Sequence, residues 1–135
     1  MFNIRTRILV VDDFKSMREM MIDALKMLGY TQILQAEDGD VAWRALSNIK
    51  PPVDLVIADW NMPKSTGYEL LQKIRSDPRF KDLPFIMSTT ENEKDKVLDA
   101  IKAGVTNYIV KPFTAETIRV KLEATAKKLA KGPAL

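Results

Sequence analysis

The stretch "DLVIADWNMP", residues 54–63, decides how this chain folds. Its apolar run LVIA is typical of a strand that is covered on both faces, because such strands are continuously apolar. The run ends on Asp59, with Trp60 beside it and Pro63 closing the segment. An acidic residue at this point can simply begin a turn, or it can belong to a site at the edge of a sheet.

Apolar runs of the same kind recur along the whole chain. The predicted strands lie in RILVVDD, QILQAE, DLVIAD, PFIMSTT and NYIVKPF, and a helical pattern follows each of them. Strands that alternate with helices predict an α/β protein, with a five-stranded parallel sheet covered on both faces. In such doubly wound folds, ligands bind outside the carboxyl ends of the strands.

The helices are predicted from apolar residues at helical spacing. The residues that carry this pattern are Met17, Met20, Met21, Ala24, Leu25 and Leu28; Ala42, Ala45, Leu46 and Ile49; Leu70, Leu71 and Ile74; Val97, Leu98 and Ile101; and a last helix from about Thr114 to Ala130. Ser16 with Glu19 and Thr66 with Glu69 fit the capping-box pattern at two helix starts. Gly29 and Gly104 are placed to end helices.

Composition excludes several classes of site. The 135 residues are 46% hydrophobic and 29% charged, which is typical of one soluble domain. There is no cysteine and no histidine, so disulfides, thiolate or imidazole metal sites and a histidine base are excluded. The net charge is +3, and the lysines of "AKKLAKG" suit a last helical turn, so we expect no nucleic-acid partner. No signal peptide or membrane span is predicted, which makes the cytoplasm the expected compartment.

Polar side chains gather at the ends of four predicted strands. The first strand ends in Asp12 and Asp13, the third in Asp59, the fourth in Ser88, Thr89 and Thr90, and the fifth in Lys111. Because parallel strands end at the same edge, these groups should converge. Three carboxylates repel one another unless a cation joins them, and hard oxygen ligands suit Mg²⁺. A lysine and a hydroxyl can hold phosphoryl oxygens, so the site favours an aspartyl phosphate.

Each of these residues also has an ordinary interpretation. Asp13 can cap the first helix, Asp59 can begin a turn before Pro63, and Lys111 can be a surface lysine. Their combined placement on matching strand ends is what favours a functional site.

The motifs "ILVVDD", "DLVIADWNMP", "IMSTTE" and "NYIVKPF" resemble those of response-regulator receiver domains. The resemblance covers residues 7 to about 129 in the family's order, and it is strongest to stand-alone chemotaxis regulators. It implies a flavodoxin-like (βα)5 fold with strand order 2-1-3-4-5. We therefore divide the chain into an N-terminal extension (1–6), a receiver domain (7–131) and a short tail (132–135).

The resemblance also implies a role for individual residues. Asp59 would accept the phosphoryl group, and Mg²⁺ would be held by Asp12, Asp13, Asp59 and the backbone carbonyl of Asn61. Thr89 would be the switch hydroxyl, Tyr108 the switch aromatic, and Lys111, before a cis proline bond, would pair with the phosphoryl group. Asn61 and Glu91 would shape the approach of water. From the residues alone, Tyr108 is equally well a half-buried strand residue.

Two positions depart from the family pattern. Thr66 stands where an acid is common, and a threonine still caps a helix. Thr90 follows the switch threonine where a small residue is usual. Thr90 either shields Asp59 from donors or caps the fourth helix.

The expected function is a phosphorylation-activated switch that is not an enzyme beyond its own phosphorylation and dephosphorylation. A sensor histidine kinase would be the donor and a flagellar motor switch protein a possible output partner, with the chain a monomer. A phosphorelay intermediate or phosphate sink fits equally well. A haloacid-dehalogenase-like phosphatase would need a second aspartate where Asn61 stands. The sequence shows neither the phosphate loop that a flavodoxin-like electron carrier needs nor the GxxxxGK motif of a P-loop protein. A DNA-binding regulator would need a second domain, which we do not expect here.

Overall fold

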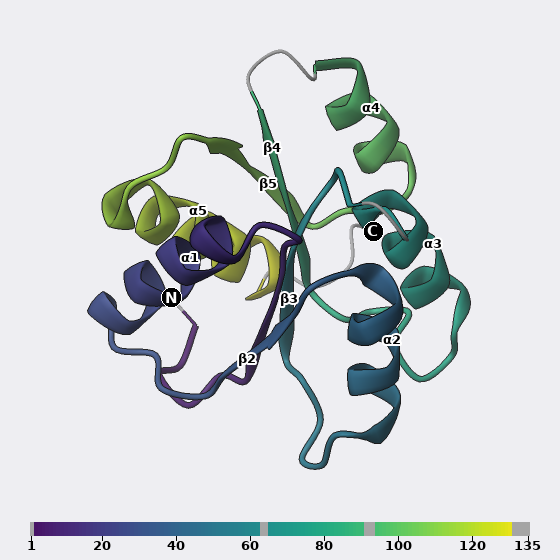
Figure 1. The fold of residues 1–135 in the computed structure, drawn as a ribbon, viewed down its shortest axis with the longest axis horizontal. Coiled ribbons are helices and arrows are strands. Elements are labelled where there is room, and N and C mark those ends of the chain that lie inside the picture. The colour runs from purple at the N-terminus through teal and green to yellow at the C-terminus, as the bar shows by residue number, and fades with distance from the viewer. Residues whose placement is uncertain (1, 63–64, 91–93, 131–135) are drawn as a thin grey trace.

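A computed structural model describes residues 2–62, 65–90 and 94–130. Five parallel strands form one sheet in the order β2-β1-β3-β4-β5, which confirms the predicted topology (Figure 1). The strands are β1 (Ile8–Val11), β2 (Ile33–Ala36), β3 (Leu55–Asp59), β4 (Phe85–Thr90) and β5 (Asn107–Lys111). The central strands β1 and β3 are buried along their whole length, as their continuous apolar sequence predicts.

Helices cover both faces of the sheet (Figure 1). They are α1 (Lys15–Met27), α2 (Gly39–Asn48), α3 (Gly67–Ser76), α4 (Lys94–Lys102) and α5 (Ala115–Ala130). One core cluster joins α1 and α5 to one face, through residues such as Leu25 and Ile118. The other joins α2, α3 and α4 to the opposite face, through residues such as Leu46, Leu70 and Ala100. The doubly wound α/β prediction is therefore confirmed.

One of the two predicted capping boxes forms. The Thr66 side chain accepts a hydrogen bond from the Glu69 backbone N–H at 3.1 Å, and the Glu69 carboxylate reaches back to the Thr66 N–H. The box predicted for Ser16 and Glu19 is wrong, because α1 begins at Lys15 and its N-cap is Phe14. Asp12 Oδ1 accepts from the Phe14 N–H instead, at 3.0 Å.

Some predicted core positions are exposed. Met20 is 50% exposed on α1, and on α4 Leu98 and Ile101 are 59% and 55% exposed. Among the α4 side chains that the structure describes, Ala100 alone is buried. The apolar spacing of α4 therefore indicated the helix correctly but not the side of it that packs on the sheet.

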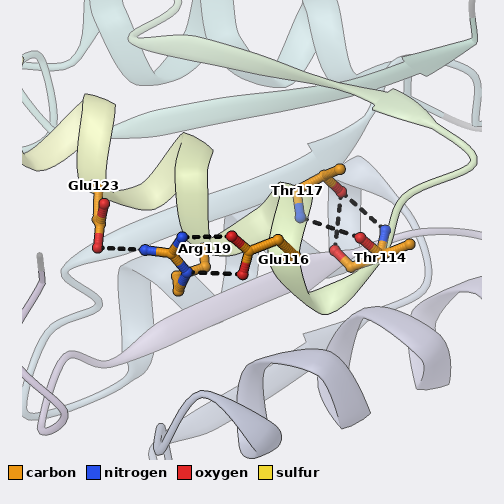
Figure 2. Close-up of polar contacts among 5 residues, drawn as sticks. All are labelled: Thr114, Glu116, Thr117, Arg119 and Glu123. Atoms are coloured by element: carbon orange, nitrogen blue, oxygen red, sulfur yellow. Dashed lines mark hydrogen bonds and ion pairs between the residues drawn. The ribbon is translucent and has the colours of Figure 1, made fainter.

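Helix α5 starts with a well-formed polar cap (Figure 2). Thr114 Oγ1 accepts from the Thr117 N–H at 3.2 Å, and Thr117 Oγ1 accepts from the Thr114 N–H at 2.8 Å. One turn later, Arg119 pairs with both Glu116 and Glu123 along the helix surface. These contacts fix the start of α5 just beyond β5, the strand that ends in Lys111.

A single arginine joins α3 to the turn between α4 and β5. The half-buried Arg75 guanidinium donates to the backbone carbonyls of Gly104, Lys81 and Leu83, at 2.9, 3.2 and 2.7 Å. It also lies 3.4 Å from the hydroxyl of Thr106. Burial lowers the pKa of Arg75, and the nearby Asp82 carboxylate partly offsets this. We call this set of contacts the Arg75 clamp.

The strand register places the functional side chains. Asp59 pairs with Ser88, and Thr90 pairs with Lys111. The Lys111–Pro112 bond is cis, as predicted. Within the described ranges, no helix combines the length and the apolar character needed to cross a membrane.

Candidate functional site

Three carboxylates meet at the carboxyl edge of the sheet. Asp12 and Asp13 follow β1, and Asp59 is the last residue of β3. One oxygen from each lies within 4.8 Å of the others. Asp12 and Asp59 are 6% and 7% exposed, and Asp13 is half-buried. The predicted convergence of these side chains is therefore observed.

Lys111 brings a positive charge to the same point. Its Nζ lies 3.3 Å from Asp12 Oδ2 and 3.2 Å from Asp59 Oδ1, and its side chain is 13% exposed. Among the described side chains, one ammonium forms ion pairs within this group of three carboxylates, so the cluster has an excess of negative charge. Such an excess is stabilised by a divalent cation.

Burial dominates the protonation of Asp59. It raises the pKa of Asp59 to about 6, from an ordinary value of 3.8. The Lys111 charge lowers this pKa, whereas the charges of Asp12 and Asp13 raise it. A raised pKa means that nearby positive charge does not fully stabilise the ionised carboxylate. A bound metal ion would supply that charge and lower the pKa.

The donor atoms suit Mg²⁺. All three side chains offer hard oxygen ligands, which Mg²⁺ prefers. Within the described residues, the buried Oδ1 of Asp13 has no hydrogen-bond partner. A buried carboxylate oxygen without a partner is unusual and is satisfied by a cation or water. The residues that are present therefore fit a magnesium site.

The hydroxyl-bearing residues of β4 lie on different faces of the sheet. Residues paired in register point to the same face, so Ser88 shares a face with Asp59. Thr89 points to the opposite face and is 1% exposed. Tyr108 pairs with Met87, two residues before Thr89, so Tyr108 and Thr89 share that opposite face. Tyr108 is half-buried, and Lys121 Nζ lies 4.4 Å from its ring centre.

Thr90, another predicted site residue, lies at the end of β4. Thr90 is exposed, and the segment between it and α4, on which its predicted capping role depends, lies outside the described residues. Glu91 lies outside the described residues.

Sequence reasoning gave Ser88 no role of its own. Its buried Oγ has no hydrogen-bond partner among the described residues. Ser88 also lines a small cavity together with Asp12 and Asp59. The strand register would have placed Ser88 beside Asp59, but the sequence does not show that its hydroxyl lacks a partner.

Sequence reasoning also missed the contacts around Trp60. The indole stacks on Tyr68, with ring centres 5.1 Å apart. Lys96 of α4 donates to Asn61 Oδ1 at 3.0 Å, and its Nζ lies 5.9 Å from the Trp60 ring centre. Nothing in the local pattern of α4 indicated this contact, which joins residues 35 positions apart.

The carboxylates and Lys111 at the carboxyl edge of a doubly wound sheet suit a protein that accepts phosphoryl groups, and comparison with known proteins supports that class. Residues 8–123 match the model of the response regulator receiver domain. The chain therefore belongs to the response regulator receiver domain family. Proteins of this family bind Mg²⁺ through an acidic pocket, which Asp12, Asp13 and Asp59 form in this chain. They are signalling proteins and not classical enzymes.

Its curated relatives are chemotaxis proteins. The chain is 49% identical to chemotaxis protein CheY1 of Helicobacter pylori over 117 residues, which cover 87% of this chain and 94% of that protein. It is 43% identical to chemotaxis protein CheY of Pseudomonas aeruginosa, over 87% of this chain and 93% of that protein. Among solved structures, chemotaxis response regulator CheY4 of Vibrio cholerae is similar with a TM-score of 0.80 and 33% identity, covering 90% of this chain and 98% of CheY4.

Fold, site and relatives together support a phosphorylation-activated response regulator that works in chemotaxis. Proteins of this kind take phosphoryl groups from histidine kinases and act on partners. Nothing found favours the haloacid-dehalogenase-like alternative, whose second aspartate is replaced by Asn61.

Proposed function

We propose that Asp59 accepts the phosphoryl group. The observation that carries this proposal is the buried carboxylate of Asp59, 3.2 Å from Lys111 and grouped with Asp12 and Asp13. An Asp59 oxygen bonds to phosphorus as the bond from phosphorus to the donor's imidazole nitrogen breaks. This sequence contains no histidine, so the phosphohistidine belongs to the kinase. Later attack by water returns phosphate and restores the free carboxylate.

The metal set in this proposal is Asp12, Asp13, Asp59 and the backbone carbonyl of Asn61. Bound Mg²⁺ would neutralise charge on the transferring phosphoryl oxygens. Lys111 is placed to move from its carboxylate partners to the phosphoryl group, because its ammonium already touches Asp59. Replacing a carboxylate partner by a phosphoryl oxygen keeps this buried charge paired.

Output is proposed to run through Thr89 and Tyr108. These two residues share the face of the sheet opposite to Asp59. Thr89 would move toward the phosphoryl group and donate a hydrogen bond to it in the active state only, which gives the two states different free energies. The resulting change at Tyr108 would reach a partner that binds the surface of α4, β5 and α5.

The proposed donor is a CheA-like sensor histidine kinase, and the proposed output partner is a flagellar motor switch protein. The chemotaxis relatives support both. We further propose that the chain acts as a monomer in the cytoplasm, without binding nucleic acid. A phosphorelay intermediate or a phosphate sink would use the same site without the motor partner.

Tryptophan fluorescence tests the chemistry directly. Trp60 follows Asp59 and is 9% exposed, whereas Trp43 lies on α2 and packs edge-on against Phe80 at 5.8 Å. Mg²⁺ and then acetyl phosphate should change the emission in two separate steps. The second step should be absent in Asp59→Asn and should persist in Trp43→Phe. A normal response to acetyl phosphate in Asp59→Asn would refute the assignment.

The partner requires a second experiment. Protein held in a phosphorylated-like state with beryllofluoride should retain a motor switch protein that the untreated protein releases. Equal retention in both states would leave the phosphoryl chemistry intact but would contradict the proposed output.

A further inference from the structure

Lys96 of α4 contacts the segment that follows Asp59. Its Nζ donates to Asn61 Oδ1 at 3.0 Å and lies 5.9 Å from the centre of the Trp60 ring. Asn61 is exposed, and the Trp60 ring also stacks on Tyr68. The contact therefore joins α4 to a loop residue two positions beyond the phosphoacceptor, across 35 residues of chain.

The chemistry of the two groups fixes which Asn61 atom is engaged. An ammonium can only donate hydrogen bonds, so it must take the amide oxygen. That oxygen is also the sole acceptor of the Asn61 side chain, and a hydrogen bond to a cation withdraws electron density from it. A water molecule that attacks phosphorus must be oriented in line, and it is oriented by an acceptor for one of its protons. While Lys96 donates to the amide oxygen, one of its two lone pairs is engaged and the oxygen is a weaker acceptor for that water.

We propose that Lys96 is a positioning residue that prolongs the phosphorylated state of Asp59 by occupying the amide oxygen of Asn61. This inference rests on the proposed phosphorylation of Asp59 and adds a control on its hydrolysis. Lys96 acts through Asn61 and does not touch the reacting atoms. Because Lys96 belongs to α4, the lifetime of the phosphoryl group depends on where α4 lies.

The test compares phosphoryl lifetimes after removal of acetyl phosphate, measured by the decay of radiolabelled phosphoprotein. Lys96→Met keeps the length of the side chain but removes the donor, and it should shorten the lifetime about three- to tenfold, the size of one solvent-exposed hydrogen bond. Lys96→Arg keeps a donor and should restore most of the lifetime. Lys102→Met is the matched control, since Lys102 is an exposed lysine on the same helix. The Trp60 emission of the unphosphorylated protein should shift in Lys96→Met and not in Lys102→Met.

A double-mutant comparison separates this inference from a general charge effect. In an Asn61→Ala background, Lys96→Met should leave the lifetime unchanged, because the oxygen on which Lys96 acts is gone. An equal shortening in both backgrounds would overturn the inference, as would equal lifetimes in Lys96→Met and Lys102→Met. Failure of the wild-type protein to take up phosphate at Asp59 is seen before any Lys96 variant is measured, and it would overturn the proposed function and this inference together.

Discussion

The Lys111 ammonium lies 3.2 Å from Asp59 Oδ1, and yet the pKa of Asp59 is raised to about 6. The attraction of one cation is therefore smaller than the cost of burying this carboxylate beside Asp12 and Asp13. The Lys111 ammonium also lies 3.3 Å from Asp12 Oδ2, so its attraction stabilises two carboxylates and not Asp59 alone. Without a bound cation, the ionised form of Asp59 is disfavoured at this site, and this has consequences that can be measured.

The first prediction concerns stability against pH in the absence of Mg²⁺. The folded protein binds a proton at Asp59 more tightly than the unfolded chain does, because its pKa is about 6 instead of 3.8. The contribution of Asp59 to stability is therefore fully present below about pH 4 and is lost as the pH rises through about 6. Asp59→Asn should abolish this loss and be more stable at pH 8, by on the order of 1–2 kcal/mol after solvent screening. Urea unfolding in EDTA measures both proteins, and a less stable Asp59→Asn at pH 8 would contradict the prediction.

The second prediction concerns the metal. Asp13→Ala should weaken Mg²⁺ binding at least tenfold, because it removes the buried carboxylate oxygen for which the described residues offer no hydrogen-bond partner. Titration of Trp60 fluorescence with Mg²⁺ gives the affinity. Asp23→Ala is the matched control, since Asp23 is exposed on α1 and its loss changes the net charge equally. Equal affinities in the two variants would exclude Asp13 as a ligand.

The third prediction separates phosphorylation from signalling. Thr89→Ala should still be phosphorylated at Asp59, because Lys111 and the carboxylates remain. Beryllofluoride should shift the Tyr108 amide resonance in the wild-type protein but not in Thr89→Ala, because the hydrogen bond that distinguishes the two states is missing there. Nuclear magnetic resonance spectra of both proteins provide the comparison. If the Tyr108 resonance moves as far in Thr89→Ala as in wild type, the switch does not depend on that hydroxyl.

The fourth prediction concerns Thr90. Its side chain is exposed at the end of β4, in register with Lys111. A β-branched side chain at that rim restricts the in-line approach of a donor and of water. Thr90→Ala should therefore speed phosphorylation by acetyl phosphate and shorten the phosphoryl lifetime, with little change in the free energy of unfolding. Unaltered rates would leave Thr90 without a role at the site.

The fifth prediction concerns the Arg75 clamp. Arg75→Met leaves the carbonyls of Leu83 and Gly104 without the donors that lie at 2.7 and 2.9 Å. The loss should lower the free energy of unfolding by roughly 2–4 kcal/mol, since four acceptors lose the Arg75 donor at once and two of these contacts are partly buried. Arg44→Met, at an exposed position of α2, should change it by less than about 0.5 kcal/mol. Chemical denaturation of the two variants makes the comparison.

The sequence predicts the strands well, because their signal is local. The continuous apolar runs indicate the strands, and the acidic residues Asp12 and Asp59 that follow these runs mark where the strands end. The Thr66–Glu69 capping box is local in the same way and is confirmed. The Ser16–Glu19 box fails because a competing local contact, from the Phe14 N–H to Asp12, starts α1 earlier.

What depends on tertiary contacts was not predictable in detail. Apolar spacing identifies α4 as a helix, but the exposure of Leu98 and Ile101 depends on how the helix is rotated against the sheet. The contact of Lys96 with Asn61 and the Arg75 clamp join distant segments through long side chains. The meeting of the carboxylates with Lys111 was predictable because the parallel topology forces all the strand ends to one edge.

Helix α4 is sparsely packed, and this lowers the free energy needed to move it. Among its described side chains only Ala100 is buried, whereas α3 buries Leu70, Leu71 and Ile74. Regions with few buried apolar contacts open at a fraction of the global free energy of unfolding, and their amide protons exchange through those openings. The amides of α4 should therefore exchange with solvent well before those of α3. A helix this loosely attached can be displaced by the small free energy that one phosphoryl group supplies, while the sheet and its five strands remain intact.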